Sequence, residues 1–508
     1  MRTITRVGPL LAAAALLAAV PPVLAHAATT SNAAPASAAA TTFNVRDYGA
    51  KGNGTTLDDD AIDRAIAAAS AAPGGTVLFP TGTYQSRSIH LRSNVTLQLN
   101  SGATIRAASS GFDPPEPNAF ARYQDFGHSH FHNALLWGDG ISNLTITGTG
   151  TIDGAGLVKT DTTPSGKGDK LLSLTRCANV TLRTATLRHG GHFAVLMNGC
   201  HDILFDHVNV LSSQARDRDG VNLVNSWNVE VSRSRIQGTD DGLSFKSDFA
   251  LGRTFVSHHI RVHDSTILST KNNAIQFGVE SCGDFTDAVF QNITIPGAGK
   301  AGIGIVSLDG AHISDLHFTG ITETRVSSPV FIRLGGRGSC PGNPPPGSIS
   351  GVTVTGLTGT HLTTPLPVQG APEYTSTVVG SPGADITDVS FSNVDLTVPG
   401  GHPASDANAA PPEGLTLYRP REFGTRPAYG FWLRHVARIS FTETVVRFEK
   451  SDGRPAYAVE DGNTVQWTDS TVQASTGPTD LRVTKVTGYQ LVRCTTTTGG
   501  TWRVRATG

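Results

Sequence analysis

Two acidic pairs lie close together in the chain, Asp217/Asp219 and Asp240/Asp241. They are separated by roughly 20 residues, which is about one turn of a parallel solenoid. Stacked coils lie about 4.8 Å apart, so carboxylates at one angular position on adjacent coils would share one patch of surface. Like charges held so close raise at least one pKa and divide the group into an acid and a base. Hydrolysis of a glycosidic bond needs such a pair, and we expect a raised pKa at Asp240 and an acidic activity optimum.

A repeated pattern predicts the coils that would position these carboxylates. Each copy has a polar residue, an alternating apolar strand, a turn and a second strand, at intervals of about 20 to somewhat above 30 residues. Clear copies begin at Asn94, Asn143, Asn179, Asp202, Asn228, His259 and Asn292, and weaker ones lie near Val352, Phe391, Phe441 and Val465. Asparagine at a coil corner can adopt the left-handed conformation and bond to its neighbours on adjacent coils. A β-propeller would have longer and more regular repeats, and a β-sandwich would lack this recurrence.

The segment before the repeats predicts a cap for the first coil. A helix is expected from about Asp59, with one apolar stripe formed by Ile62, Ala65, Ile66 and Ala69. An uncovered solenoid end would expose apolar surface and strand edges, which this helix would protect. We expect one catalytic domain over residues 42–508, with a Pro-rich loop at about 400–427 followed by terminal coils.

The N-terminal sequence predicts an export signal. A basic start, an apolar run from Leu10 to Val20 and the small-residue site Ala25-His26-Ala27 are typical of a signal peptide over residues 1–27. The alternative is a membrane anchor, which the short apolar run disfavours. Residues 28–41 are rich in Ala, Ser and Thr and are expected to be a disordered linker. We therefore expect a secreted, extracellular protein.

Composition narrows the classes of partner. The 508 residues carry a formal net charge of −1, which argues against a nucleic-acid or membrane-surface role. The five cysteines have no zinc-ligand spacing. Cys177 and Cys200 lie about one coil apart and would stack as thiols or as a disulfide, while Cys282 and Cys340 lie in Gly-rich loops and could pair. We expect a monomer that uses no cofactor and no metal.

The chain resembles the pectin-degrading parallel β-helix proteins, and in particular glycoside hydrolase family 28, the polygalacturonases and their relatives. The residues that carry this resemblance are DYGAKGNG near the start, GGTVLFPTGTY after it, the Asn-Val-Thr-Leu coils, and RDG followed by TDDGLSFKS. The resemblance extends from about residue 42 to residue 336. It implies an all-β fold, a right-handed single-stranded parallel β-helix with a short N-terminal capping helix.

The resemblance also implies an inverting hydrolysis of a plant-type, pectic polysaccharide. Asp240 would be the general acid, and Asp219 and Asp241 would hold and deprotonate the attacking water. An inverting enzyme needs its acid and base roughly 6.5 to 9.5 Å apart to leave room for that water. The structural alternative is that these aspartates only terminate turns, as Asp-Gly pairs often do.

The substrate-binding candidates follow from where this chain departs from the family. Asn272-Asn273-Ala274 stands where the family has Gly-His-Gly, so we expect Asn273 to replace the histidine that supports the acid. Gly304-Ile305-Val306 stands where the family has Arg-Ile-Lys, so either cations come from elsewhere or the bound sugar is neutral. The expected substrate-binding residues are Arg218, Lys246, His192, Asn273, Lys271, His130, His132 and Arg333, with Arg337 as a further cation.

Three histidines alternate in Gly127-His128-Ser129-His130-Phe131-His132 and would face one way on a strand. Cleft lining is the preferred interpretation and a metal site the alternative. Two other functions remain open, a β-helix lyase that uses Ca²⁺ and a basic residue, and a non-catalytic carbohydrate-binding solenoid. Long loops near residues 111–125 and 341–346 would favour exo attack if they wall one end of the groove.

Overall fold

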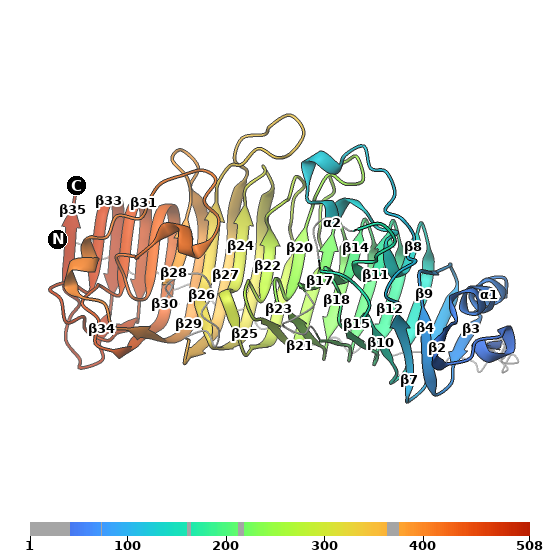
Figure 1. Cartoon of the computed structure of the whole chain (residues 1–508). Helices are drawn as coiled ribbons and strands as arrows, with labels where there is room; N and C mark the ends of the chain where they lie inside the picture. Colours follow the sequence, from blue (N-terminus) through green and yellow to red (C-terminus); the bar gives the residue numbers. More distant parts are fainter. Residues whose placement is uncertain (1–40, 73, 160–163, 212–217, 363–374) are drawn as a thin grey trace, which may run out of the picture. The chain divides into compact units, whose positions relative to one another are not determined.

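The computed structural model describes residues 41–72, 74–159, 164–211, 218–362 and 375–508. The expected signal peptide, nearly all of the expected linker and Asp217 lie outside these ranges. The described residues from 41 onward belong to one compact unit. Its 35 strands pair in parallel from each coil to the next (Figure 1). The expected right-handed parallel β-helix is thereby confirmed.

The elements follow one another coil by coil. The first strands are β1 (Thr42–Asn44), β2 (Asn53–Leu57), β3 (Thr76–Phe79), β4 (Gly82–Ser86), β5 (Ile89–His90), β6 (Val95–Leu99), β7 (Ala103–Ala107), β8 (Ala134–Asp139), β9 (Ser142–Thr147) and β10 (Thr151–Asp153). The central strands are β11 (Lys170–Thr175), β12 (Ala178–Arg183), β13 (Thr186–Arg188), β14 (Phe193–Asn198), β15 (His201–Asp206), β16 (Asn209–Leu211), β17 (Asp219–Val224), β18 (Trp227–Ser232), β19 (Arg235–Gly238), β20 (Leu243–Lys246), β21 (Ile260–Ser269), β22 (Ile275–Gly278), β23 (Ala288–Ile295) and β24 (Ala298–Ser307). The last strands are β25 (His312–Thr324), β26 (Val326–Leu334), β27 (Ser348–Thr360), β28 (Ser376–Val379), β29 (Ile386–Gly400), β30 (Phe431–Lys450), β31 (Tyr457–Thr468), β32 (Thr471–Val472), β33 (Leu481–Val492), β34 (Thr495–Thr496) and β35 (Val504–Thr507). The helices are α1 (Asp59–Ser70) and α2 (Phe126–Ser129), with 3-10 turns η1 (Val45–Tyr48), η2 (Ala121–Tyr123), η3 (Ala404–Asn408) and η4 (Pro420–Phe423).

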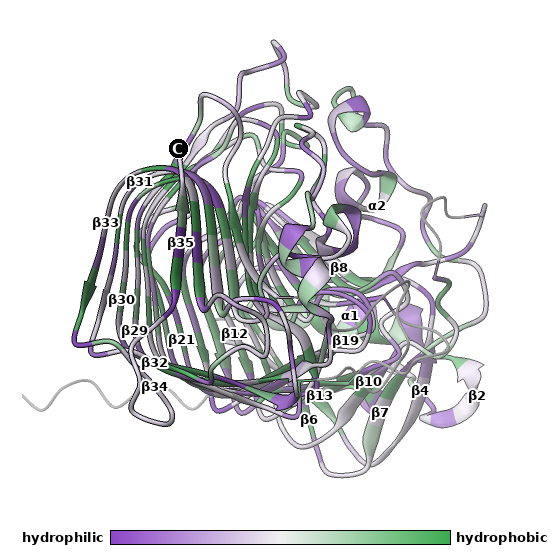
Figure 2. Cartoon of the chain, turned by 90° about the vertical axis from the view of Figure 1, so that its left-hand side faces the viewer, coloured by the Kyte–Doolittle hydropathy of each residue, from purple (hydrophilic) through white to green (hydrophobic). Residues whose placement is uncertain are grey.

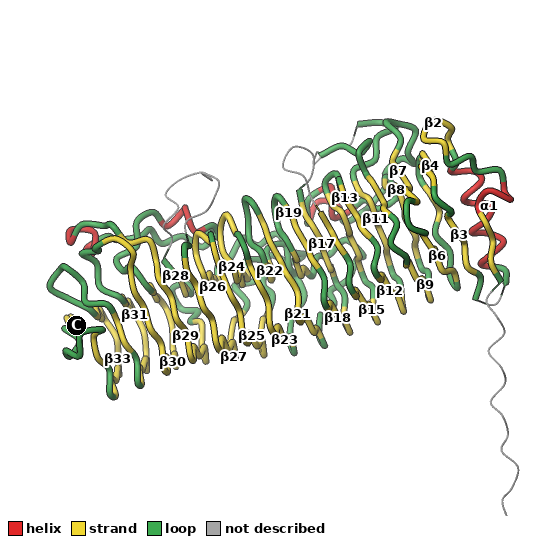
Figure 3. The backbone as a smooth tube through the Cα atoms, turned by 90° about the horizontal axis from the view of Figure 1, so that it is seen from below, coloured by secondary structure: helices red, strands yellow, loops and turns green. Residues whose placement is uncertain are grey.

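Apolar side chains stack inside the solenoid at fixed register. Val221 pairs with Leu243, Leu243 with Ile275, and Ile275 with Ile303, and all four side chains are buried. Each such side chain contributes about 1.5–3 kcal/mol by leaving water. The strands form the walls, and long loops extend from one side of the coils (Figures 2 and 3). This interior ladder fixes which residues of successive coils lie beside one another on the outer surface.

The coil corners are built as the sequence predicts. The first residue of each of the seven clear repeats has a positive φ, between 52° and 63°. The side-chain amide of Asn143 donates to Asn94 over 2.7 Å, and that of Asn179 donates to Asn143 over 2.8 Å. Asparagine tolerates this left-handed conformation better than most residues, which explains its recurrence there.

The N-terminal helix covers the first coils, and four of the five cysteines form disulfides. In α1 the buried side chains include Ile62, Ala65, Ile66 and Ala69, and the helix packs against β1, β3 and β5 of the first coils. Two disulfides form, Cys177–Cys200 between adjacent coils and Cys282–Cys340 between loops, while Cys494 is free. Within the described ranges, none of the helices is long and apolar enough to cross a membrane.

Candidate active site

A cleft of about 330 Å³ opens over the ends of the central strands. Successive coils supply its floor, and two loops supply its sides, one carrying α2 and the other leading into η4. The lining is strongly polar, with five carboxylates facing six lysines and arginines. The charged lining residues are Asp125, Asp219, Asp240, Asp241, Glu280, Arg218, Lys246, Lys271, Lys300, Arg419 and Arg421.

One column of polar residues crosses the cleft from coil to coil. The backbone N–H of Asp240 donates to the carbonyl of Arg218 over 2.8 Å, and the Arg218 guanidinium lies 3.4 Å from the Asp240 carboxylate. On the next coil the Asn272 side chain donates to Asp240. On the coil after that, the N–H of Lys300 donates to the Asn272 carbonyl over 3.0 Å. We call Arg218, Asp240, Asn272 and Lys300 the cleft column.

A second row holds the other two aspartates. The N–H of Asp241 donates to Asp219 Oδ1 over 3.3 Å, and Asn222 donates to Asp219 Oδ2 over 3.1 Å. Asp219 and Asp241 are only 5% and 7% exposed, whereas the Asp240 side chain is 32% exposed. Asp241 Oδ1 is buried and has no hydrogen-bond partner among the described residues. The structure therefore brings the three predicted aspartates into one cleft.

The neighbours of each carboxylate set its affinity for a proton. Burial raises the pKa of Asp219 well above its usual range, and the charges of Asp240 and Asp241 add to this effect. Burial and the Asp240 charge raise the pKa of Asp241 to about 6. At Asp240 burial acts upward, but Lys300, the Asn272 hydrogen bond and Arg218 outweigh it and lower the pKa. The predicted raised pKa at Asp240 is therefore wrong for the unliganded protein, because cations surround this carboxylate.

A buried ion pair lies under the aspartates. Lys246 Nζ donates to Glu280 Oε2 over 2.8 Å, and His128 Nδ1 lies 3.2 Å from the same oxygen. Burial acts to lower the pKa of Lys246, but the charges of Glu280 and Asp219 outweigh it and raise the pKa. Burial likewise opposes the charge on Glu280, yet Lys246 and His128 hold its pKa well below the usual range. The pair is therefore ionised, and the charge of its Lys246 ammonium acts to lower the pKa values of Asp219 and Asp241.

Cations also gather around Lys300, the last member of the cleft column. Lys300 and Lys271 come from the coils, and Arg419 and Arg421 come from the Pro-rich loop beside Tyr418. Burial lowers the pKa of Lys300, the two aspartates Asp240 and Asp241 raise it, and Arg419 and Arg421 lower it further. Several positive groups held this close together form a site for a negatively charged group.

Five of the eight expected substrate-binding residues line the cleft. They are Arg218, Lys246, His192, Asn273 and Lys271. Asn273 does not support the acid as expected, because its side chain bonds to Gln276 and to the N–H of Ala301. Its neighbour Asn272 bonds to Asp240 instead.

The other three expected residues lie elsewhere. Arg333 is 2% exposed, and its guanidinium donates to loop carbonyls, among them Leu417 O at 2.8 Å. His130 stacks on Phe126, and His132 stacks on Trp137 outside the cleft. The expected strand with three histidines on one side is wrong, because α2 occupies part of this segment and only His128 reaches the cleft. Arg337 pairs with Asp309.

Several cleft residues were missed from the sequence. Lys300 lies in GAGKAG, one coil beyond Asn272, and the regular coil interval could have identified it. Arg419 and Arg421 had no such signal, because a loop of irregular length brings them over the coils. The same holds for Asp125 and Glu280, which reach the cleft from a loop and a strand end, whereas His128 lines the cleft as the preferred interpretation of the histidine segment expected.

Comparison with known proteins decides the family. The model of glycosyl hydrolases family 28 matches residues 76–413, which is more than half of the chain. The chain belongs to this family. Membership confirms the resemblance drawn from the sequence, and a glycosidase is the class of enzyme that the family's description names.

Individual relatives are more distant. An exo-poly-alpha-D-galacturonosidase of Dickeya chrysanthemi is 25% identical over 40% of this chain and 41% of its own length. A polygalacturonase of Malus domestica is 26% identical over 57% of this chain and 61% of its own length. The chain thus spans about half the length of these curated relatives. A family 28 exopolygalacturonase structure from Yersinia enterocolitica aligns with a TM-score of 0.46 and 16% identity, covering 93% of this chain and 78% of that one.

Proposed function

We propose that the protein hydrolyses a glycosidic bond next to a uronic acid unit, in a polygalacturonan-like saccharide, with Asp219, Asp240 and Asp241 as the catalytic groups. The observation that carries this proposal is the meeting of three carboxylates from two adjacent coils in one cleft. Family 28 membership supports the reaction class. The polygalacturonase names of the relatives support the choice of sugar.

The roles follow from exposure and contacts. Asp240 is the most exposed of the three side chains, so it is the group that can reach the oxygen of the leaving sugar. It gives its proton to that oxygen as the glycosidic bond breaks. A water held by the more buried Asp219 and Asp241 attacks the anomeric carbon from the opposite face, and its proton passes to one of these two carboxylates. The anomeric configuration is inverted.

The acid must be protonated when the substrate is bound. In the free protein, burial raises the pKa of Asp240, but Lys300 and Asn272 lower it further than burial raises it. A substrate carboxylate placed on Lys300 would neutralise that cation, and the pKa of Asp240 would rise. Asp240 would then hold the proton that the leaving group needs only after an anionic sugar has bound.

The cations also explain why a uronic acid fits better than a neutral sugar. The family's Arg-Ile-Lys motif has no counterpart at Gly304-Ile305-Val306, but Lys300, Arg419 and Arg421 converge on the same cleft. A neutral sugar would bring no negative charge to these clustered cations, two of which, Arg419 and Arg421, act against the charge on Lys300.

We also propose that the enzyme attacks chain ends. His128 of α2 lies 3.3 Å from Lys246 Nζ and packs on the Phe193 ring. A Cβ at Gly127 would lie 2.7 Å from that ring, so α2 leaves no passage for a polymer over β14. A cleft walled in this way would hold a terminal sugar rather than the middle of a chain.

Digestion of defined oligogalacturonates tests these statements together. We expect single sugars to be released stepwise, and proton NMR of the first product to show the anomer opposite to the substrate linkage. Asp240→Asn should abolish release. Products that absorb in the ultraviolet and activity that disappears with a chelator would support the lyase alternative, and an active Asp240→Asn variant would overturn the hydrolase proposal.

Export is a further part of the proposal. Two disulfides support it, because such bonds persist in oxidising compartments outside the cytosol. N-terminal sequencing of protein collected from the medium should show cleavage after Ala27. Protein retained in the cells with an intact N-terminus would contradict this.

A further inference from the structure

A second cavity, of about 280 Å³, lies on the same face of the solenoid beyond α2. The ends of β8 and β11 form its floor at Asp139 and Thr175, and residues 116–120, 131, 132, 250 and 251 enclose it. The strand register relates this floor to the active-site cleft. Asp139 pairs with Thr175, Thr175 with Asn198, Asn198 with Val224, and Val224 with Lys246. Asp139 and Thr175 of the second cavity therefore lie four and three coils away from Lys246, and the loop that carries α2 lines both cavities.

The walls of this cavity are fixed in place. The Asn118 side chain donates to Ser129 O over 2.9 Å and to Ala250 O over 3.0 Å, so it ties the two enclosing loops together. The Phe120 ring packs edge-on against Phe249 and lies over Gly252, where a Cβ would come within 2.5 Å of it. A preformed cavity of this size is typical of a small-ligand site at the lower end of the usual range, about 300 Å³.

The charges here differ from those of the active-site cleft. Among the described residues of the lining Arg176 is the one lysine or arginine, and two carboxylates, Asp139 and Glu116, share the lining with it. Glu116 is engaged by the N–H groups of Phe131 and His132 at 2.9 and 3.0 Å. Arg176 pairs with Asp139 through one terminal nitrogen, and its side chain is 58% exposed. An anionic sugar would meet two carboxylates, so this cavity disfavours a uronate.

We propose that this second cavity is a non-catalytic binding site for a neutral sugar unit. A neutral pyranose offers a face of C–H groups and a rim of hydroxyls that both donate and accept. The C–H face can pack on the apolar surface that Phe120, Phe131 and Leu251 provide. The hydroxyls can bond to the donors and acceptors of the Arg176–Asp139 pair. The site would hold a neutral branch or neighbouring glycan while the cleft works on an acidic chain end.

Binding is tested on full-length protein with Asp240→Asn, so that no substrate is consumed. Methyl glycosides of neutral hexoses, a 6-deoxyhexose and a pentose are titrated and followed by saturation-transfer NMR. We expect at least one to bind. We expect Arg176→Asn to weaken that binding about tenfold, as expected for the loss of a charge-assisted hydrogen bond. Asparagine is chosen because Arg176 has a φ of 52°, which asparagine tolerates.

Phe120→Ala should also weaken binding, and this substitution lies in an enclosing loop rather than in a coil. Arg183→Asn, on the exposed surface away from both cavities, is the matched control. Arg176→Asn in the otherwise unmodified enzyme should leave oligogalacturonate hydrolysis unchanged, which separates this site from the proposed reaction. The inference is overturned if none of the glycosides binds, if binding survives both Arg176→Asn and Phe120→Ala, or if oligogalacturonate displaces the neutral sugar.

Discussion

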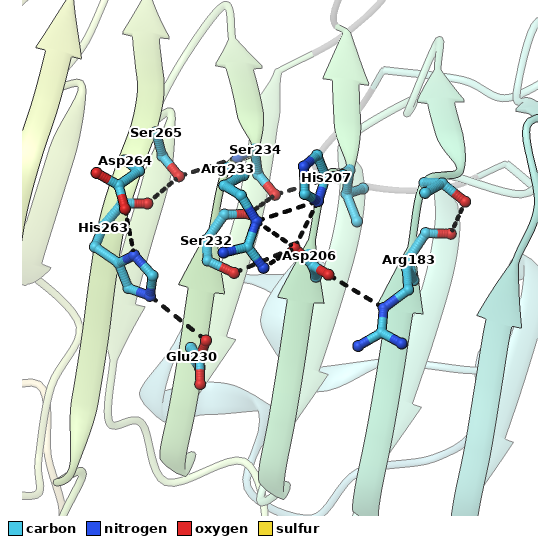
Figure 4. A network of polar contacts seen from close by, with 12 residues as sticks. Arg183, Asp206, His207, Glu230, Ser232, Arg233, Ser234, His263, Asp264 and Ser265 are labelled. Atoms are coloured by element: carbon cyan, nitrogen blue, oxygen red, sulfur yellow. Dashed lines mark hydrogen bonds and ion pairs between the residues drawn. The ribbon is translucent and has the colours of Figure 1, made fainter.

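Two columns of stacked side chains on this solenoid have nearly the same composition and opposite properties. The cleft column is Arg218, Asp240, Asn272 and Lys300. The second, at the ends of β12, β15, β18 and within β21, is Arg183, Asp206, Ser232 and His263, which pair in register. Figure 4 shows the Asp206 carboxylate between Arg183 and Arg233, at 3.1 and 2.6 Å, with His207 at 2.7 Å.

The difference lies in how many carboxylates are buried next to one another. Asp206 is one carboxylate among three basic partners; burial opposes its charge, but Arg233 and His207 outweigh burial and lower its pKa. In the cleft, two further carboxylates lie beside Asp240, and burial raises the pKa of both. Coil stacking alone therefore makes a stable surface network. A reactive site arises where stacking buries several carboxylates side by side, because burial and their mutual repulsion then raise the pKa values of Asp219 and Asp241.

The largest contrast should appear between Asp240→Asn and Asp206→Asn in activity. The loss of a general acid costs about 10²–10⁴-fold, so we expect kcat of Asp240→Asn to fall by about a thousandfold. Asp206→Asn should leave kcat within about twofold, because this carboxylate faces away from the cleft. Initial rates on trigalacturonate, with circular dichroism to verify folding, measure both. Equal losses in the two variants would remove the distinction drawn here.

Lys300→Met tests whether the cations of the cleft bind the carboxylate of the substrate. Truncating one partner of a desolvated charge pair costs enough to lower kcat/KM for an acidic substrate by about tenfold to a hundredfold. A methyl-esterified substrate has no carboxylate to lose, so the variant should be no worse than the original protein on that ester. A similar loss on both substrates would assign Lys300 to the fold rather than to substrate charge.

The sequence was sufficient for the repeated part of the molecule and insufficient for the loops. Asn94, Asn143 and Asn179 could be placed at coil corners because each coil presents the same steric demand at the same point. The aspartates could be placed together for the same reason. Arg419 and Asp125 could not be placed in the cleft, because their loops have no period and reach the cleft from parts of the chain far from the aspartates. The pKa of Asp240 was mispredicted because Lys300 was not seen to lie two coils away.

Asp241→Asn should stabilise the protein at neutral pH. Its folded pKa, about 6, lies above the usual unfolded value of about 3.9, so its ionisation penalises the folded state above pH 6. That difference is worth roughly 2–3 kcal/mol, which the neutral amide avoids. The gain should shrink as pH falls from 6 to 4, because the carboxyl is then protonated in the folded state and already about half protonated in the unfolded chain. Denaturant unfolding at pH 7.5 and pH 4 measures it. A variant that is less stable at pH 7.5 would show that the carboxylate is better satisfied than its contacts suggest.

Asp206→Asn should have the opposite sign and a smaller size. The pKa of Asp206 is lowered in the folded protein, so the charged form stabilises the fold above the unfolded pKa and this stability is lost as pH falls through the folded pKa. Its arginine partners are about half exposed, which limits the network to roughly 1 kcal/mol. We therefore expect a modest destabilisation at pH 7.5 that disappears at low pH and is reduced by added salt. Comparing this salt dependence with that of Asp241→Asn is decisive, because the Asp241 effect arises from burial and should respond little to salt. If both variants shifted stability in the same direction at pH 7.5, the buried carboxylates of the cleft and the Asp206 network would differ only in position.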